Sequence, residues 1–243
     1  MIPLKDTIPS RRFPLVNTTI IALNVLAFLV EISMGQQVER QIVFTFGLVP
    51  ARFWAESGIA RWLPVFSSMF LHGGWWHIIS NMLALYIFGD NVEDRLGHTR
   101  YLIFYLLGGV LAALAQIWAY PGSTIPTIGA SGAIAAVLGA YFVLYPLSRV
   151  ITLIPIPVFF FFPIVEIPAL IYLGFWFLSQ LFNGTFALTA NAGTLQNGGV
   201  AWWAHIGGFI AGMILVKIFA VGSSPPRHSL HRDVFYPDEY YPW

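Results

Sequence analysis

The sequence contains no cysteine and few charged residues. The absence of cysteine excludes disulfide bonds, thiolate metal sites and cysteine nucleophiles. Only 9% of the 243 residues are charged, whereas soluble domains carry roughly 25%. The formal net charge of +1 at pH 7 provides no basic field for a polyanion. We therefore expect no nucleic-acid partner.

Metal-binding motifs are also missing. None of the six histidines belongs to the His-Glu-x-x-His pattern that a membrane zinc protease needs. We therefore expect no metal ion and no cofactor.

Apolar residues dominate what remains: they make up 57% of the chain, and the mean hydropathy is +0.72. Inside a bilayer every backbone polar group must be bonded internally, which only helices or closed barrels achieve. The long, unbroken apolar runs of this chain favour helices. The sequence therefore predicts an all-α polytopic membrane protein.

Hydropathy predicts six transmembrane helices, each near the ~20 residues that a bilayer requires. The predicted helices cover residues 17–34, 75–89, 101–120, 129–147, 164–182 and 200–221. An alternative for the first run is a signal peptide, but no Ala-x-Ala cleavage site follows it. The chain then divides into an N-terminal segment (1–16), a six-helix membrane domain (17–221) and a flexible C-terminal tail (222–243).

The apolar segment 150–165 is short for a span and contains three prolines, at positions 155, 157 and 163. Because proline disrupts helices, we expect this segment to be an interfacial connector that lies on the membrane surface.

Lysine and arginine predict the orientation, because these residues are enriched on the cytoplasmic side. Six spans place both termini on the same side. With the N-terminus inside, nine basic residues lie on the cytoplasmic side (Lys5, Arg11, Arg12, Arg95, Arg100, Arg149, Lys217, Arg227 and Arg232) and three outside (Arg40, Arg52 and Arg61). We expect a multi-pass integral protein, in the plasma (inner) membrane, with both termini cytoplasmic.

Two polar residues lie in predicted helices that both run inward from the outer face. Ser131 stands between glycines in the segment Gly129-Ala130-Ser131-Gly132, and His205 lies near the start of the last helix. A serine in a membrane helix usually bonds to its own turn, whereas an intramembrane histidine is expensive and indicates function. At matched depth, the two predict a serine nucleophile activated by a histidine base.

Small residues allow these two helices to approach closely. Gly132, Ala136 and Ala140 follow one another at i, i+4 spacing, and Gly208 and Gly212 lie on the same side as His205. Such stripes also occur as ordinary packing motifs, so on their own they predict proximity and not catalysis.

A third polar group is formed by His77 and Asn81, which share one helix face at i, i+4 spacing. Both can donate hydrogen bonds, and acyl transfer needs donors for the negative charge that develops on the carbonyl oxygen. Alternatively, the two side chains satisfy each other.

In this order on hydrophobic spans, the three motifs closely resemble those of the rhomboid intramembrane serine proteases. Gly129-Ala130-Ser131-Gly132 is similar to the family's Gly-x-Ser-Gly, the segment from Ala204 to Gly208 to its histidine motif, and the segment from His77 to Asn81 to its His-x-x-x-Asn.

The resemblance implies a six-helix rhomboid-like bundle that cuts single-span transmembrane proteins near the outer surface of the lipid bilayer. It implies that Ser131 is the nucleophile and that His205 takes and returns its proton. It also implies that His77, Asn81, Gly129 and the backbone N–H of Ser131 stabilise the oxyanion.

The sequence departs from the family pattern at two places. Position 135 is alanine, where some members carry a tyrosine that stacks on the histidine, so the orientation of His205 must come from elsewhere. Arg61-Trp62 reverses the family's Trp-Arg pair in the first loop. We also expect the long outer loop 35–74 to be partly embedded, and the uncharged loop 183–200 to be a flexible cap over Ser131.

Three alternative functions can be tested against the sequence. An inactive rhomboid-like binder of membrane proteins typically lacks the serine or the histidine, and both are present here. A transporter predicts internal repeats, which we do not find. Asp90 follows Gly89, as in intramembrane aspartyl proteases, but that chemistry needs two neighbouring carboxylates, and we expect no second buried one.

Overall fold

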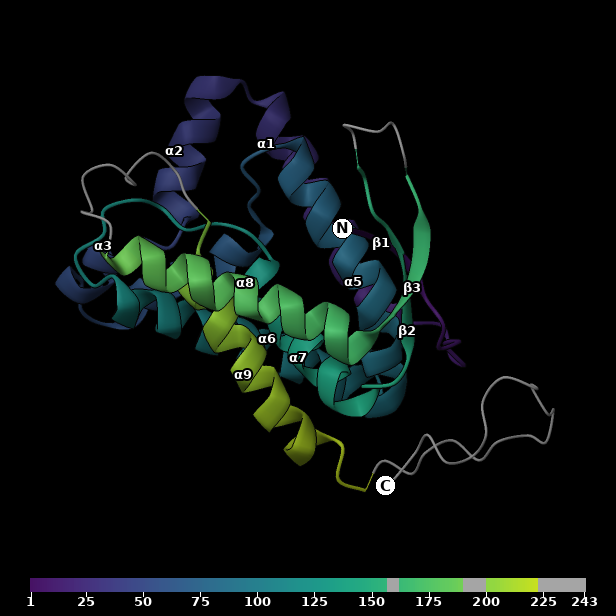
Figure 1. Cartoon of the computed structure of the whole chain (residues 1–243). Helices are drawn as coiled ribbons and strands as arrows, with labels where there is room; N and C mark the ends of the chain where they lie inside the picture. The colour runs from purple at the N-terminus through teal and green to yellow at the C-terminus, as the bar shows by residue number, and fades with distance from the viewer. Residues whose placement is uncertain (157–161, 190–199, 223–243) are drawn as a thin grey trace, which may run out of the picture.

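The computed structural model describes residues 1–156, 162–189 and 200–222, and this part of the chain is mostly helical (Figure 1). The long helices are α1 (Leu15–Ser33), α5 (Trp75–Leu96), α6 (His98–Ala119), α7 (Ser131–Leu144), α8 (Ala169–Thr189) and α9 (Trp202–Phe219). Shorter elements between α1 and α5 are α2 (Gln36–Phe46), α3 (Pro50–Ala55), η1 (Ile59–Trp62), α4 (Leu63–Ser67) and η2 (Ser68–Phe70). Three strands complete the fold: β1 (Ile2–Asp6), β2 (Arg149–Leu153) and β3 (Ile164–Pro168).

Three of the long helices, α1, α6 and α9, are long and apolar enough to cross a membrane. Each lies within three residues of a predicted span at both ends. Large apolar side chains on the outer helix faces are exposed, for example Trp118 on α6 and Ile214 on α9, as expected where a helix surface contacts lipid. The protein is therefore a membrane protein, while six as the number of spans remains a prediction.

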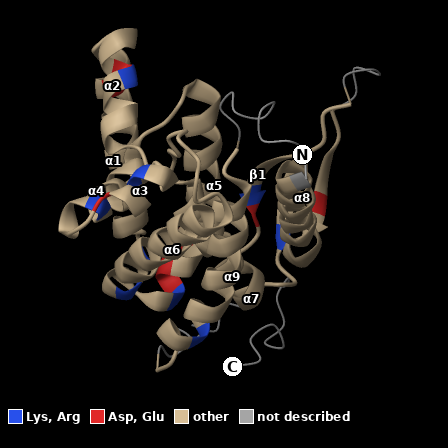
Figure 2. Cartoon of the chain, turned by 90° about the vertical axis from the view of Figure 1, so that its left-hand side faces the viewer, with Lys and Arg blue, Asp and Glu red and all other residues tan. Residues whose placement is uncertain are grey.

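Charged residues are absent from long stretches of the helices (Figure 2). Most of them lie on α2 and α3, in the strands, in the last two turns of α5 and near the ends of α6 and α9, and Glu31 lies near the end of α1. This distribution keeps ionised groups away from the middle of the apolar helices, where they would be costly.

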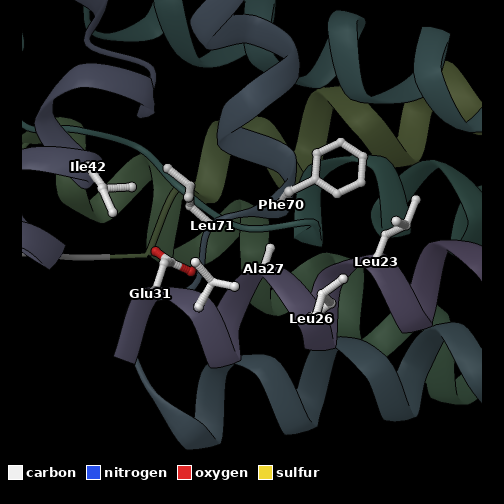
Figure 3. A pocket seen from close by; sticks show the side chains of 8 residues that line it. Leu23, Leu26, Ala27, Glu31, Ile42, Phe70 and Leu71 are labelled. Atoms are coloured by element: carbon white, nitrogen blue, oxygen red, sulfur yellow. The ribbon is translucent and has the colours of Figure 1, made fainter. Parts of the chain in front are cut away.

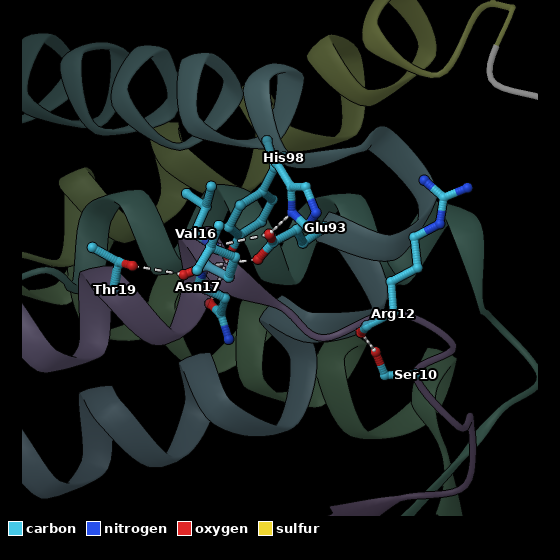
Figure 4. Close-up of polar contacts among 9 residues, drawn as sticks. Ser10, Arg12, Val16, Asn17, Thr19, Glu93 and His98 are labelled. Atoms are coloured by element: carbon cyan, nitrogen blue, oxygen red, sulfur yellow. Dashed lines mark hydrogen bonds and ion pairs between the residues drawn. The ribbon is translucent and has the colours of Figure 1, made fainter.

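Helix α5 continues to Leu96, well past the predicted end at residue 89, because its last turns carry polar residues that bind other elements. Glu93 accepts hydrogen bonds from the backbone N–H groups of Val16 (2.9 Å) and Asn17 (2.7 Å), and His98 contacts the same carboxylate (Figure 4). The unpaired N–H groups at a helix start and the helix dipole both favour a carboxylate there. This buried contact explains why α1 begins near residue 15.

Helix α7 is the centre of the bundle and packs against α5, α6 and α9. The small-residue faces predicted on α7 and α9 meet as expected. A Cβ added at Gly208 would overlap the carbonyl oxygen of Gly132, and one added at Gly212 would overlap that of Ala136. The two backbones are therefore in direct contact, which only glycine permits at these positions.

Gly212→Ala should consequently destabilise the protein, because the new methyl group must push α9 away from α7. We expect a loss of about 1–3 kcal/mol, the usual cost of overpacking, measured as a lower unfolding midpoint in detergent. Gly174→Ala on α8 is the matched control, since the nearest atom to its new Cβ lies 3.8 Å away. Equal unfolding midpoints for the two variants would contradict the close contact.

The predicted start of the fifth helix at residue 164 was wrong. The described parts of segment 150–165 contribute to two strands: β2 pairs antiparallel with both β1 and β3 in a sheet of order β1-β2-β3. The position of this segment on the membrane surface stays a prediction. Helix α8 accordingly begins at Ala169, because residues 164–168 form β3. Proline breaks helices but is tolerated at strand ends, and the ladder satisfies the backbone groups. The fold is therefore not all-α, and the sheet lies at one side of the helices (Figure 1).

A polar network attaches β1 to the helices. Asn91 Nδ2 donates to Asp6 Oδ2 (2.8 Å) and lies 3.0 Å from Asp90 Oδ1, while the hydroxyl of Tyr141 also donates to Asp6. Asp90 therefore does have a neighbouring carboxylate, contrary to the expectation from sequence. Both carboxylates contact the same amide, which serves to anchor a strand at the end of α5 and α7.

Burial raises the pKa of Asp6 from 3.8 to about 6, although its hydrogen bond with Tyr141 opposes the shift. A folded-state pKa above the unfolded value means that the folded protein binds more protons, so stability falls as pH rises between these two values. Through this group, the free energy of unfolding should fall by roughly 1–3 kcal/mol as pH rises over this range. We expect Asp6→Asn to lack this contribution. The check is the unfolding midpoint of both proteins between pH 4 and 6.5; parallel curves would contradict the prediction.

The loop predicted to be partly embedded, 35–74, is largely helical. Arg52 holds it together by donating to the backbone oxygens of Phe44 (2.6 Å), Thr45 (3.1 Å) and Gly47 (2.8 Å). Arg61 stacks over the ring of Phe53 at 4.9 Å. Arg52, with bonds to three backbone oxygens, therefore contributes more of these contacts to the loop than Arg61.

An apolar groove of about 460 Å³ lies between α1 and the following loop, with Glu31 in its wall (Figure 3). One oxygen of Glu31 accepts the backbone N–H of His72 at 3.2 Å. None of the predicted site residues lines this groove.

Candidate active site

Ser131 and His205 lie together. Ser131 is the first residue of α7, and His205 lies in the first turn of α9. Their side chains meet with Ser131 Oγ 2.8 Å from His205 Nε2. Residues 74 positions apart in sequence thus form a hydrogen bond within a hydrophobic bundle, the geometry that a base-activated hydroxyl requires.

Close backbone packing makes this contact possible. Gly132, which follows Ser131, and Gly208, about one turn after His205, have no room for a side chain. His205 is 8% exposed, and Ala204 beside it is also buried. The imidazole is therefore held in a dry environment with its Nε2 atom directed at the serine, which strengthens electrostatic interactions within the site.

His77, in the first turn of α5, lies against the backbone of Gly129. A Cβ added at Gly129 would be 2.6 Å from His77 Nε2 and 3.6 Å from Ser131 Oγ. One small atom at this position would therefore contact both side chains. Gly129 has a φ of +122°, a conformation that side-chain-bearing residues rarely adopt.

The hydrogen bonding of His77 indicates which of its nitrogens carries the proton. The backbone N–H of Gly73 donates to Nδ1 at 3.3 Å, so a neutral ring carries its proton on Nε2. His72 packs edge to face against His77, with ring centroids 5.0 Å apart. Burial lowers the pKa of His72 to about 4, so its ring is neutral near pH 7. With its Nδ1 accepting from Gly73, a neutral His77 has Nε2–H as its donor, and this atom faces the position that a side chain at residue 129 would fill.

Two further groups of hydrogen-bond donors belong to the helices that carry Ser131 and His77. Helix α7 begins at Ser131 without a side-chain cap, so the N–H groups of its first turn remain available to an anion. Asn81 lies one turn after His77, and its buried Nδ2 has no hydrogen-bond partner among the described residues. A buried donor without a partner is costly and is available to a ligand.

Sequence reasoning missed two residues of α8 that contact His205. Gln180 Oε1 lies 2.8 Å from His205 Nδ1, and the ring of Trp176 lies 5.8 Å from the imidazole at an angle of 34°. The i, i+4 spacing of a tryptophan and a glutamine in a mostly apolar helix was the available signal. These residues contact the histidine, whereas Ala135 contributes no functional group.

The predicted cap, 183–200, lies largely outside the described residues. Its first part, 183–189, belongs to α8 and is helical, so the flexible loop does not begin at residue 183 as predicted. The predicted flexible tail also lies outside the described residues, apart from Gly222.

Together these contacts bring a hydroxyl, an imidazole and several N–H donors around one small space. Such an arrangement suits attack on a carbonyl carbon, because it provides a nucleophile, a base and stabilisation for the resulting oxyanion. Within the described ranges, no three histidine, aspartate or glutamate residues are grouped so as to hold a metal ion.

Comparison with known proteins matches residues 59–221 to a family model described as a rhomboid domain. The chain is 29% identical over 157 residues to Rhomboid protein 1, mitochondrial, of Saccharomyces cerevisiae (63% of this chain, 40% of that protein). It is 35% identical over 121 residues to Rhomboid protease GluP of Bacillus subtilis (49% of this chain, 22% of that protein). It is 28% identical over 177 residues to Rhomboid-like protein 11, chloroplastic, of Arabidopsis thaliana (71% of this chain, 57% of that protein). The chain thus spans less than two thirds of each of these relatives.

Proposed function

The chain belongs to the rhomboid family, and from this we propose that it is a serine endopeptidase of the membrane that hydrolyses peptide bonds in or near transmembrane segments. The observation that carries the proposal is the 2.8 Å contact between Ser131 Oγ and His205 Nε2. Relatives whose names identify them as rhomboid proteases support the same reaction class.

In the proposed reaction, Ser131 Oγ attacks the scissile carbonyl carbon while His205 Nε2 takes the hydroxyl proton. The imidazolium then gives this proton to the leaving amine, which leaves an acyl ester on Ser131. Water attacks the ester, His205 takes a proton from that water and returns it to Ser131, and the acid product departs.

The oxyanion forms twice in this sequence, and we propose that His77, Asn81 and the N–H of Ser131 stabilise it in the space left open by the missing side chain of Gly129. Each preorganised donor typically contributes about 3 kcal/mol to the transition state. The positive end of the α7 dipole acts in the same direction.

The length of α7 supports hydrolysis below the membrane surface. Its 14 residues span about 21 Å at 1.5 Å per residue, less than the ~30 Å of a hydrocarbon core. With the far end of α7 at one boundary, Ser131 lies several ångströms beneath the other. A cut there requires the substrate helix to unwind and present an extended backbone.

Contacts at the opposite end of the bundle support the proposed orientation. Asp6 binds the ends of α5 and α7, and Arg100 at the start of α6 donates to the backbone oxygen of Phe219 at the end of α9 (3.2 Å). This is the end where most basic residues lie, so we propose that it is cytoplasmic, with both termini inside. We propose the plasma (inner) membrane as the location, although some relatives are named as mitochondrial or chloroplastic.

The proposed partners are single-span membrane proteins in the lipid bilayer. The test is cleavage in liposomes of a model single-span substrate with alanine and glycine near its outer boundary. A product of defined mass, formed at one bond, is the expected result. Stable co-purification of the substrate without cleavage would instead support an inactive rhomboid-like binder.

A further inference from the structure

The Nδ1 atom of His205 has a specific partner on α8. Gln180 Oε1 lies 2.8 Å from it, and the contact is buried, with Gln180 5% exposed and His205 8% exposed. A buried polar contact of this kind is held in place by the cost of leaving either group unpaired. It lies on the side of the imidazole opposite Ser131.

The rest of the local network determines how the Gln180 amide is turned. Its Nε2 atom donates to the backbone oxygen of Trp176 (3.2 Å) and lies 2.9 Å from Ser179 Oγ. A carbonyl oxygen can only accept, so the amide nitrogen must face Trp176 and the amide oxygen must face His205. Turning the amide over would place its oxygen against the Trp176 oxygen.

This orientation has a consequence for the imidazole. Because Gln180 Oε1 can only accept, His205 Nδ1 must carry a hydrogen. A neutral ring then has its lone pair on Nε2, the atom that faces Ser131 Oγ. The glutamine therefore selects the tautomer in which Nε2 can take a proton.

Trp176 supports the same imidazole from the side. Its ring lies at 34° to the imidazole, with the centroids 5.8 Å apart, and its backbone oxygen anchors Gln180. Ala135, on α7, is fully buried and packs where Gly208 would place a side chain. The partner of Nδ1 and the ring beside the imidazole thus come from one turn of α8, and Ala135 on α7 supplies neither.

We propose that Gln180 is a positioning residue: by accepting the Nδ1–H of His205, it holds the imidazole in the tautomer that accepts the Ser131 proton. This inference rests on the proposed peptidase function. It adds a neutral third member to the Ser131–His205 pair, one that orients the base without contacting the substrate.

The test compares wild type with Gln180→Met, which keeps the length of the side chain but replaces the amide oxygen by a weakly accepting thioether, and with Gln180→Glu, which keeps an acceptor oxygen. Asn183→Ala is the matched control, since Asn183 lies on the same helix but its amide donates to the backbone oxygen of Ser179. The first measurement is nitrogen NMR of histidine-labelled protein in detergent, at a pH where imidazoles are neutral, with His205 assigned from a His205→Ala sample. The second is the rate of labelling by a fluorophosphonate probe.

We expect wild type, Gln180→Glu and Asn183→Ala to show the Nδ1–H tautomer at His205. Gln180→Met should show a mixture of tautomers and label roughly ten-fold more slowly, as expected for one lost hydrogen bond. An unchanged Nδ1–H tautomer in folded Gln180→Met would overturn the inference. Gln180→Leu, which has no acceptor at all, provides a second variant should Gln180→Met not fold.

The two measurements separate this inference from the proposed function. If wild type does not react with the probe, the peptidase proposal fails, and the nitrogen shifts still show whether Gln180 sets the tautomer. If wild type reacts and the tautomer does not depend on Gln180, only the positioning role fails.

Discussion

Replacing Ser131 by alanine is expected to abolish covalent labelling by a fluorophosphonate probe and cleavage of a membrane substrate. Replacing His205 by alanine should have nearly the same effect, because the hydroxyl then has no base within hydrogen-bonding distance. Loss of a serine or its histidine base in a serine protease costs on the order of 10⁶-fold in rate, and such losses are not additive. The double variant should therefore be no slower than either single variant.

The Ser131→Ala protein should remain folded, since the change removes one hydroxyl at the start of α7. Its unfolding midpoint in detergent is the first control. Ser33→Ala is the second, because Ser33 Oγ bonds to the backbone of its own helix (2.8 Å to Val30 O) and lies outside the site. Probe labelling that persists in Ser131→Ala would place the reactive nucleophile elsewhere and contradict the mechanism.

The residues of the site could be predicted from sequence because each is a polar residue in a local pattern that is energetically costly inside a membrane. A histidine and an asparagine in an apolar helix, or a serine between glycines at a helix start, are expensive inside a membrane unless they have partners. The small residues of α7 and α9 further indicated which helices meet. The contact between Ser131 and His205 follows from those two observations together.

Gln180 and the strands were not predicted, for a different physical reason. One glutamine in an apolar helix is compatible with a bond to its own turn, and only the position of α8 beside α9 brings it to His205. The pairing of β1 with β2 joins residues that are far apart in sequence, from Ile2 with Leu153 to Asp6 with Val150, and no local propensity encodes such a ladder. Three prolines in segment 150–165 correctly argued against a helix but did not indicate which structure replaces it.

Helix ends were predicted less well than helix centres because hydropathy does not detect capping contacts. Helix α5 extends beyond its apolar part since Glu93 binds the start of α1, a contact between sequence positions 76 residues apart. Helix α7 is shorter than its apolar run because it starts at Ser131, where the glycine at 129 turns the chain into the site.

The second large effect is expected for Gly129→Ala. Residue 129 has a φ of +122°, and a methyl group there would lie 2.6 Å from His77 Nε2 and 3.6 Å from Ser131 Oγ. The methyl group would displace His77 and fill the space where the substrate oxygen is proposed to bind. We expect the rates of probe labelling and cleavage to fall by roughly 10²–10³-fold or more, the loss seen when an oxyanion donor is removed.

Backbone strain alone does not explain this expected loss, and Gly74→Ala separates the two causes. Gly74 also has a positive φ, +148°, and precedes α5 near His77, but nothing lies within 4 Å of an added Cβ. Both variants should lose about 1–3 kcal/mol of stability from strain, whereas only Gly129→Ala should lose most of its activity. If Gly74→Ala is as inactive as Gly129→Ala, strain near the site is the cause. If Gly129→Ala retains wild-type activity, the oxyanion does not bind between His77 and the start of α7.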